Sequence, residues 1–147
     1  MLQTNDDLHY MRLALDEAQK AYEQGEIPVG CIIVCNKQIV GRGHNLTEML
    51  QDVTAHAEMQ ALTAAMQTLG SKYLPECTLY VTLEPCIMCA GAIGWAQIRR
   101  LVFGAHDEKR GYQLFAPRAL HPKCEVHSGI MEEECSNLIK QFFTNKR

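Results

Sequence analysis

The sequence lacks both a long apolar run and an apolar leader. No run approaches the roughly 18 apolar residues that a membrane-spanning helix needs, and the longest, residues 27–35, is interrupted by Pro28 and Gly30. The first twelve residues, MLQTNDDLHYMR, carry acidic side chains and lack the apolar core of a signal peptide. These absences predict a soluble, globular protein of the cytoplasm with no membrane partner.

Cysteine is present, but not in a pattern that favours disulfides. The chain has 7 cysteines, an odd number, and no secretory signal precedes them. Reduced thiols are therefore expected. A closely spaced pair such as Cys86 and Cys89 then indicates metal or redox chemistry more than a structural disulfide.

A strong excess of charge of one sign is also lacking, because the net charge is −3. The charge is unevenly distributed, however, with +3 in residues 97–147 and −6 in residues 1–96. Basic pairs occur at Arg99–Arg100, Lys109–Arg110 and Lys146–Arg147. Such pairs fit either a solvated surface or a face that binds anions.

Hydrophobic periodicity predicts a single domain over residues 1–147, in which strands alternate with helices. Because a helix or a long crossover separates the later strands, these strands are expected to be parallel, with helices packed on the faces of the sheet. Helices are expected at residues 4–25, 54–69, from 84–85 onward and at 131–143, a hairpin at 28–45 that turns at 36–37, strands at 77–83, 100–104 and 124–127, and an irregular segment at 105–122.

The segment EPCIMC carries two thiols at the start of a helix. Cys86 and Cys89 are three residues apart and follow Pro85, which fits the first helical position. In a first turn, residues i and i+3 share a face, and the free N–H groups and helix dipole there favour thiolates. Two thiolates at this spacing supply half of a zinc site.

The segment TAHAE places His56 and Glu58 at a spacing that does not share a helix face. With the helix beginning near Thr54, both lie in its first turn, where side chains can approach one centre from two sides. If the two helix starts meet, His56, Cys86 and Cys89 supply three ligands and Glu58 stays unliganded beside them. Three protein ligands with one open position are typical of a catalytic zinc, which activates water, and Glu58 would move protons.

Other interpretations of these residues exist. The C-x-x-C alone would suit a redox pair, which would leave His56 and Glu58 without a use. A structural zinc would need a fourth ligand, for which Cys77 and His44 are candidates without the usual spacing. The combination of H-x-E with P-C-x-x-C is the signature of zinc-dependent nucleobase deaminases, which replace the amine of a cytosine- or adenine-like ring by hydrolysis.

Longer stretches of the sequence resemble one family. TAHAE, LYVTLEPCIMCAGAI, RLVFGAHD, GEIPVGCIIV and GRGHN resemble the bacterial tRNA-specific adenosine deaminases (the TadA family), within the cytidine deaminase-like superfamily, from about Tyr10 to Phe143. The resemblance implies a three-layer α/β/α fold with a mixed five-stranded sheet, a homodimer and one Zn²⁺ per chain. The implied reaction converts adenosine to inosine at the wobble position of a tRNA anticodon loop.

The resemblance also implies a role for individual residues. Glu58 would shuttle protons beside the zinc ligands, and Asn45 would hydrogen-bond the edge of the base, although from local sequence Asn45 fits a turn equally well. The expected zinc ligands are His56, Cys86 and Cys89, and the expected pocket-lining residues are Val29, Asn45, Leu83 and Glu84.

The chain departs from the family pattern at His44, at Val53 and in the stretch YQLFAPRALHPK, residues 112–123, where the family is rich in Gly and Ser. In the family, this loop and the C-terminal helix approach the RNA. RNA contacts are therefore expected from Lys109–Arg110 and from Lys146–Arg147.

Two other functions fit the same motifs. The first is deamination of a free base or nucleoside of the guanine or cytosine type, for which Trp95 in the third helix would be suited. The second is an inactive zinc-bearing subunit that binds RNA or a partner. The presence of the shuttle carboxylate Glu58 disfavours this second function.

Overall fold

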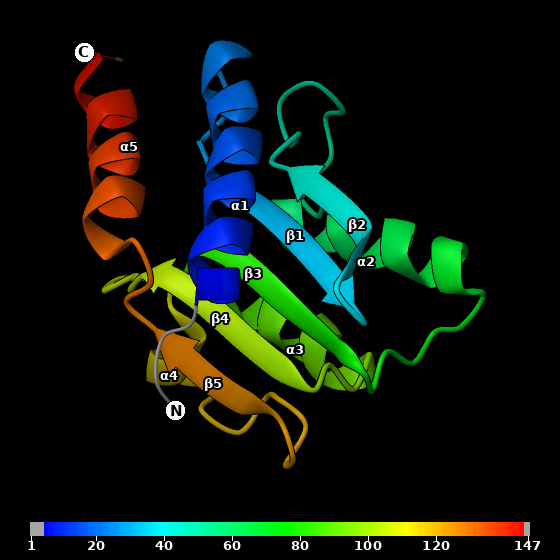
Figure 1. Cartoon of the computed structure of the whole chain (residues 1–147). Helices are drawn as coiled ribbons and strands as arrows, with labels where there is room; N and C mark the ends of the chain where they lie inside the picture. Colours follow the sequence, from blue (N-terminus) through cyan, green and yellow to red (C-terminus); the bar gives the residue numbers. More distant parts are fainter. Residues whose placement is uncertain (1–4, 146–147) are drawn as a thin grey trace.

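The computed structural model describes residues 5–145, which form a five-stranded sheet of order β2-β1-β3-β4-β5 (Figure 1). β1 pairs antiparallel with β2 and β3, whereas β3–β4 and β4–β5 are parallel. The predicted mixed sheet and the predicted parallel pairing of the later strands are therefore confirmed. The strands are β1 (Gly30–Cys35), β2 (Gln38–His44), β3 (Cys77–Leu83), β4 (Arg100–Ala105) and β5 (Glu125–Ser128).

Helices cover both faces of the sheet, which confirms the predicted α/β/α layers (Figure 1). Successive side chains of a strand point to opposite faces, so Ile33 packs in one core cluster and Ile32 in the other. None of the helices in residues 5–145 is long and apolar enough to span a membrane. One face carries α1 (Asn5–Glu23) and α5 (Glu132–Asn145), and the other carries α2 (Ala57–Leu69) and α3 (Ile87–Trp95).

The starts of α2 and α3 differ from the predicted ones. α2 begins at Ala57 rather than at Thr54, with His56 as its N-cap. α3 begins at Ile87 with Cys86 as its N-cap, so Pro85 precedes the cap and does not occupy the first helical position. Both cap residues have extended backbone, as is usual for an N-cap.

The segment 105–122 is less irregular than expected. Gly111 forms an isolated bridge with Cys86, and the next four residues form the short helix α4 (Tyr112–Phe115). The backbone of Tyr112 donates a hydrogen bond of 2.9 Å to the carbonyl of Pro85. This segment is therefore attached to the start of α3.

A glycine in β2 sets the position of α2. A Cβ atom at Gly43 would overlap the carbonyl oxygen of Ala57 and the backbone nitrogen of Ala61. Because Gly43 has no side chain, the first turn of α2 packs directly on the strand. The start of α2 is thereby held next to Asn45, which follows β2.

Candidate active site

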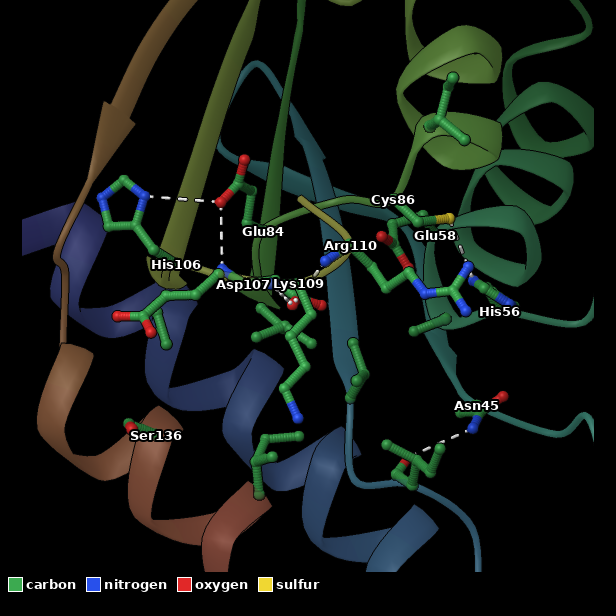
Figure 2. Close-up of a pocket in the computed structure, with 18 of the residues that line it drawn as sticks. Asn45, His56, Glu58, Glu84, Cys86, His106, Asp107, Lys109, Arg110 and Ser136 are labelled. Atoms are coloured by element: carbon green, nitrogen blue, oxygen red, sulfur yellow. Dashed lines mark hydrogen bonds and ion pairs between the residues drawn. The ribbon is translucent and has the colours of Figure 1, made fainter. Parts of the chain in front are cut away.

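The N-terminal ends of α2 and α3 meet at one cluster of side chains. His56 Nδ1 lies 3.6 Å from Cys86 Sγ and 3.5 Å from Cys89 Sγ, and the three ligand atoms lie within 4.8 Å of one another. Figure 2 shows His56 and Cys86 directed toward each other beside Glu58. One imidazole and two thiols are a ligand set that zinc accepts, so the structure brings together the three predicted ligands.

The chemistry of the cluster fits a metal ion. The hydrogen bond with Cys89 lowers the pKa of Cys86 to about 4, and a hydrogen bond with His56 adds to this effect. The same contact with Cys86, together with burial, raises the pKa of Cys89. The arrangement thus favours a thiolate at Cys86, which is the form that binds a metal.

Neither candidate for a fourth ligand joins the cluster. His44 Nδ1 lies 3.1 Å from Glu17 Oε1, and its Nε2 lies 3.1 Å from Gln24 Oε1. Cys77 lies opposite Cys35 in the pairing of β1 with β3. Within residues 5–145 the cluster has three ligands, which is the number typical of a catalytic zinc site.

Glu58 lies next to the cluster in the first turn of α2. Its side chain is buried, with 3% of the residue exposed, and burial raises its pKa to about 7. Glu58 lines the same pocket as His56 and Cys86. A buried carboxyl group in this position is suited to accept and return a proton.

The cluster opens into a pocket of about 1150 Å³, which is lined by all four predicted pocket residues, Val29, Asn45, Leu83 and Glu84. Asn45 acts as both a turn residue and a wall residue. Its Nδ2 donates to the carbonyl of Ile27 at 3.3 Å, and its Oδ1 accepts the N–H of Thr47 at 3.2 Å. An amide has two donors and two acceptor positions, so one of each is left for a base.

Glu84 has a role that the sequence did not predict. Its carboxylate accepts backbone hydrogen bonds from Asp107 at 3.0 Å and from Gln113 at 3.1 Å, and it lies 3.5 Å from His106 Nδ1. A Cβ atom at Gly111 would overlap this carboxylate. Glu84 therefore lies beneath residues 106–113 and holds them against the pocket, as the dashed lines in Figure 2 show for His106 and Asp107.

The segment that Glu84 holds carries one of the predicted basic pairs into the pocket. Asp107 Oδ1 accepts the backbone N–H groups of Lys109 and Arg110, both at 3.0 Å. Both basic residues line the pocket, as does Lys140 of α5. In Figure 2 the Arg110 side chain extends toward the part of the pocket that contains Glu58.

The other two basic pairs differ from this one. Arg100 of β4 forms an ion pair with Asp7 of α1 at 2.6 Å. The charge of Arg100 is therefore paired inside the fold. The predicted contacts of Lys146–Arg147 fall outside the described residues.

Two further residues near the site were not predicted from the sequence. Glu26 is buried, and its carboxylate accepts the backbone N–H groups of Glu48 at 3.0 Å and Met49 at 2.8 Å, which fixes the loop after Asn45. Phe115 of α4 lines the pocket. The available signals were a carboxylate before an apolar strand and an aromatic residue in a polar segment, and neither identifies a site without the fold.

The sequence is similar to those of known zinc-binding deaminases. A family model for the cytidine and deoxycytidylate deaminase zinc-binding region matches residues 4–105. The tRNA-specific adenosine deaminase of Agrobacterium fabrum (strain C58 / ATCC 33970) is 44% identical over 144 residues, which cover 95% of each chain.

Solved structures agree with these matches. A structure from work on A-to-I editing by tRNA:A34 deaminases at the wobble position is 44% identical, with a TM-score of 0.83 over 88% of this chain and 98% of that chain. A guanine deaminase from Nitrosomonas europaea has a TM-score of 0.80 over 98% of this chain and 87% of its own at 20% identity, which shows a common fold alone. By the family model and the 44% identity over nearly its whole length, the chain belongs to the tRNA-specific adenosine deaminases, within the cytidine and deoxycytidylate deaminase family.

Proposed function

We propose that this protein is a zinc-dependent deaminase that converts adenosine to inosine at the wobble position of a tRNA anticodon loop. The observation that carries the proposal is the buried Glu58 beside the cluster of His56, Cys86 and Cys89, at the floor of a pocket. The family of the chain supports the choice of substrate.

Each residue of the cluster has a role in this reaction. His56, Cys86 and Cys89 hold one zinc ion, which supplies Lewis-acid activation of water at neutral pH. Glu58 accepts one proton from the attacking water and passes it to the ring nitrogen, and it then carries the second proton of that water to the departing amine. Water and adenosine are consumed, and inosine and ammonia are released.

The remainder of the pocket binds the substrate. The free positions of the Asn45 amide hydrogen-bond the edge of the base, and Val29 and Leu83 form an apolar wall. A base must leave its stack to reach Glu58, as in other enzymes that modify bases. Lys109 and Arg110 line the pocket and supply cations for the phosphates of an RNA strand, and a neutral free base would make no use of them.

We also propose that the chain works as a single domain in a homodimer, in the cytoplasm where its substrate would be modified. Four large apolar residues outside the main pocket are exposed, as residues of a subunit interface are in an isolated chain. They are Met49, Leu50, Val53 and Trp95, which are 60%, 52%, 84% and 83% exposed. Trp95 does not line the pocket of its own chain. Trp95→Glu should shift the sedimentation of the protein toward that of a monomer, whereas an unmodified protein that sediments as a monomer would contradict the dimer.

The proposed function is tested by ammonia release from the zinc-loaded protein. One substrate is an anticodon stem-loop with adenosine at the wobble position, and the other is a mixture of free bases and nucleosides. We expect release from the stem-loop alone, weakening steeply with salt because phosphate contacts are lost. A stem-loop with guanosine at the wobble position is the control. Release from the mixture alone would overturn the tRNA assignment and leave the deaminase chemistry.

A further inference from the structure

We propose that the ring of Phe115 stacks on the base of a nucleotide that adjoins the target adenosine, so that the pocket has a second base site at its mouth. This inference rests on the tRNA substrate proposed above. Phe115 is the last residue of α4, is 60% exposed and lines the pocket. Exposed aromatic rings are the usual platforms for unpaired bases in RNA-binding proteins.

Comparison with two nearby residues supports this role. Leu114 is also 60% exposed, but it does not line the pocket. Phe143 of α5 lines the pocket at 49% exposure, and its ring packs edge-on against Phe142 at 5.4 Å. Phe115 makes no aromatic ring contact with another residue of the described chain, so no second ring covers it.

The backbone holds Phe115 in place. The N–H of Ala116 donates to the carbonyl of Tyr112 at 2.7 Å, and the N–H of Leu114 donates to the carbonyl of Gly111 at 3.1 Å. Tyr112 is 2% exposed and bonds to the backbone of Pro85. The backbone that carries the ring therefore belongs to a turn attached to the start of α3, and a backbone that is already ordered loses little entropy when a base binds.

The surroundings of Phe115 fit an RNA strand. Lys109 and Arg110 precede it on the same loop and line the same pocket, so cations for phosphates lie beside the aromatic ring, a combination typical of sites for single-stranded nucleic acid. The pocket of about 1150 Å³ also exceeds the roughly 300–1,000 Å³ typical of a small-ligand site. The space beyond the floor near Glu58 can therefore receive a neighbouring nucleotide.

The test combines protein variants with altered RNA. Phe115→Ala, Phe115→Trp and the control Leu114→Ala are assayed on the anticodon stem-loop with wobble adenosine. They are also assayed on two stem-loops that each lack one base, either 5′ or 3′ of the target. We expect Phe115→Ala to raise KM about 5- to 150-fold, the range for one stacked base, with kcat nearly unchanged. Phe115→Trp and Leu114→Ala should stay close to the unmodified protein.

The stem-loops that lack a base separate stacking from a general structural effect. Removal of one of the two bases should raise the KM of the unmodified protein by a factor similar to that caused by Phe115→Ala. The same removal should not raise the KM of Phe115→Ala any further. Two results would overturn the inference: a KM change below twofold in Phe115→Ala, or an equal rise in KM for both proteins on both altered RNAs. Zinc content and circular dichroism verify that Phe115→Ala is folded.

A binding assay distinguishes failure of this inference from failure of the proposed function. Glu58→Ala protein, with and without Phe115→Ala, is titrated with a fluorescent stem-loop, and the anisotropy gives the affinity without turnover. If the unmodified protein left the wobble adenosine intact, the proposed function would fail. The anisotropy comparison would still decide whether Phe115 binds a base, because an unchanged affinity would exclude it.

Discussion

The two walls of the pocket hold their functional groups by different means. The wall formed by the starts of α2 and α3 buries Glu58 and Cys89, at 3% and 0% exposure, within helices packed on the sheet. The second, exposed wall consists of residues 106–115, presents Phe115 and depends on the carboxylate of Glu84. Reactive groups thus lie where water is excluded and electrostatic effects are strong, and RNA-binding groups lie where a long substrate can reach them.

Removal of a ligand from the buried wall should have the largest effect. Cys89→Ala leaves two of the three donors, so zinc content should fall well below one per chain and deamination should be lost. Metal analysis of the purified protein measures this directly. Cys135→Ala is the matched control, because Cys135 is also buried but faces the other side of the sheet, near Gly104 of β4. Full zinc content in Cys89→Ala would refute its assignment as a ligand.

Removal of the proton carrier should spare the metal. Glu58→Ala is expected to lower kcat by about 10²- to 10⁴-fold, the usual contribution of a general acid–base group, while zinc content and stem-loop affinity are retained. Single-turnover deamination of the stem-loop gives the rate, and Glu23→Ala, at an exposed site in α1, serves as the control. A variant that deaminates at the original rate would show that another group moves the proton.

The sequence predicted the buried wall far better than the exposed one. Its signals are local, since H-x-E and P-C-x-x-C each span a few residues. Even there the start of α2 was placed too early. The Asp52 side chain accepts the backbone N–H and hydroxyl of Thr54, so these residues form a turn before the helix.

The exposed wall depends on contacts between residues far apart in the sequence. Glu84 bonds to Asp107 and Gln113, which follow it by 23 and 29 positions. No periodicity in residues 105–122 indicates that a buried carboxylate lies beneath them. The short helix α4 and the exposed Phe115 belong to this anchored segment. Because the sequence does not show the anchoring, it predicted only an irregular segment.

Asp7 is a buried carboxylate that does not line the pocket, so its replacement tests stability separately from function. Asp7 is 2% exposed, pairs with Arg100 at 2.6 Å and accepts the Tyr80 hydroxyl at 2.8 Å. Burial alone would raise the pKa of Asp7, but these partners outweigh it and hold the pKa below the ordinary 3.8. A lowered pKa stabilises the fold above about pH 4, and this contribution is lost as the pH falls through the folded-state pKa.

Asp7→Asn should therefore lower the free energy of unfolding by about 3 kcal/mol at pH 7, the low end for a broken buried pair. The difference from the unmodified protein should narrow below pH 4, as urea titrations at several pH values would show. Asp6→Asn, at an exposed neighbouring site, should have no such effect. A raised KM for the stem-loop in folded Asp7→Asn protein would indicate that the two faces of the sheet are coupled.

The smallest effect is expected from Glu84→Gln, which tests whether the exposed wall is positioned by one carboxylate. The glutamine amide nitrogen accepts no hydrogen bond, so one backbone N–H of Asp107 or Gln113 loses its partner, at a cost of about 1–3 kcal/mol. That cost loosens the loop that carries Lys109 and Arg110, so KM for the stem-loop should rise about tenfold while zinc content and kcat stay nearly unchanged. Glu76→Gln, at an exposed position just before β3, is the control. Glu84 directly precedes Pro85 and the cap of α3. A loss of zinc in Glu84→Gln would therefore mean that this carboxylate supports the buried wall as well, and the two walls would not be separate at this residue.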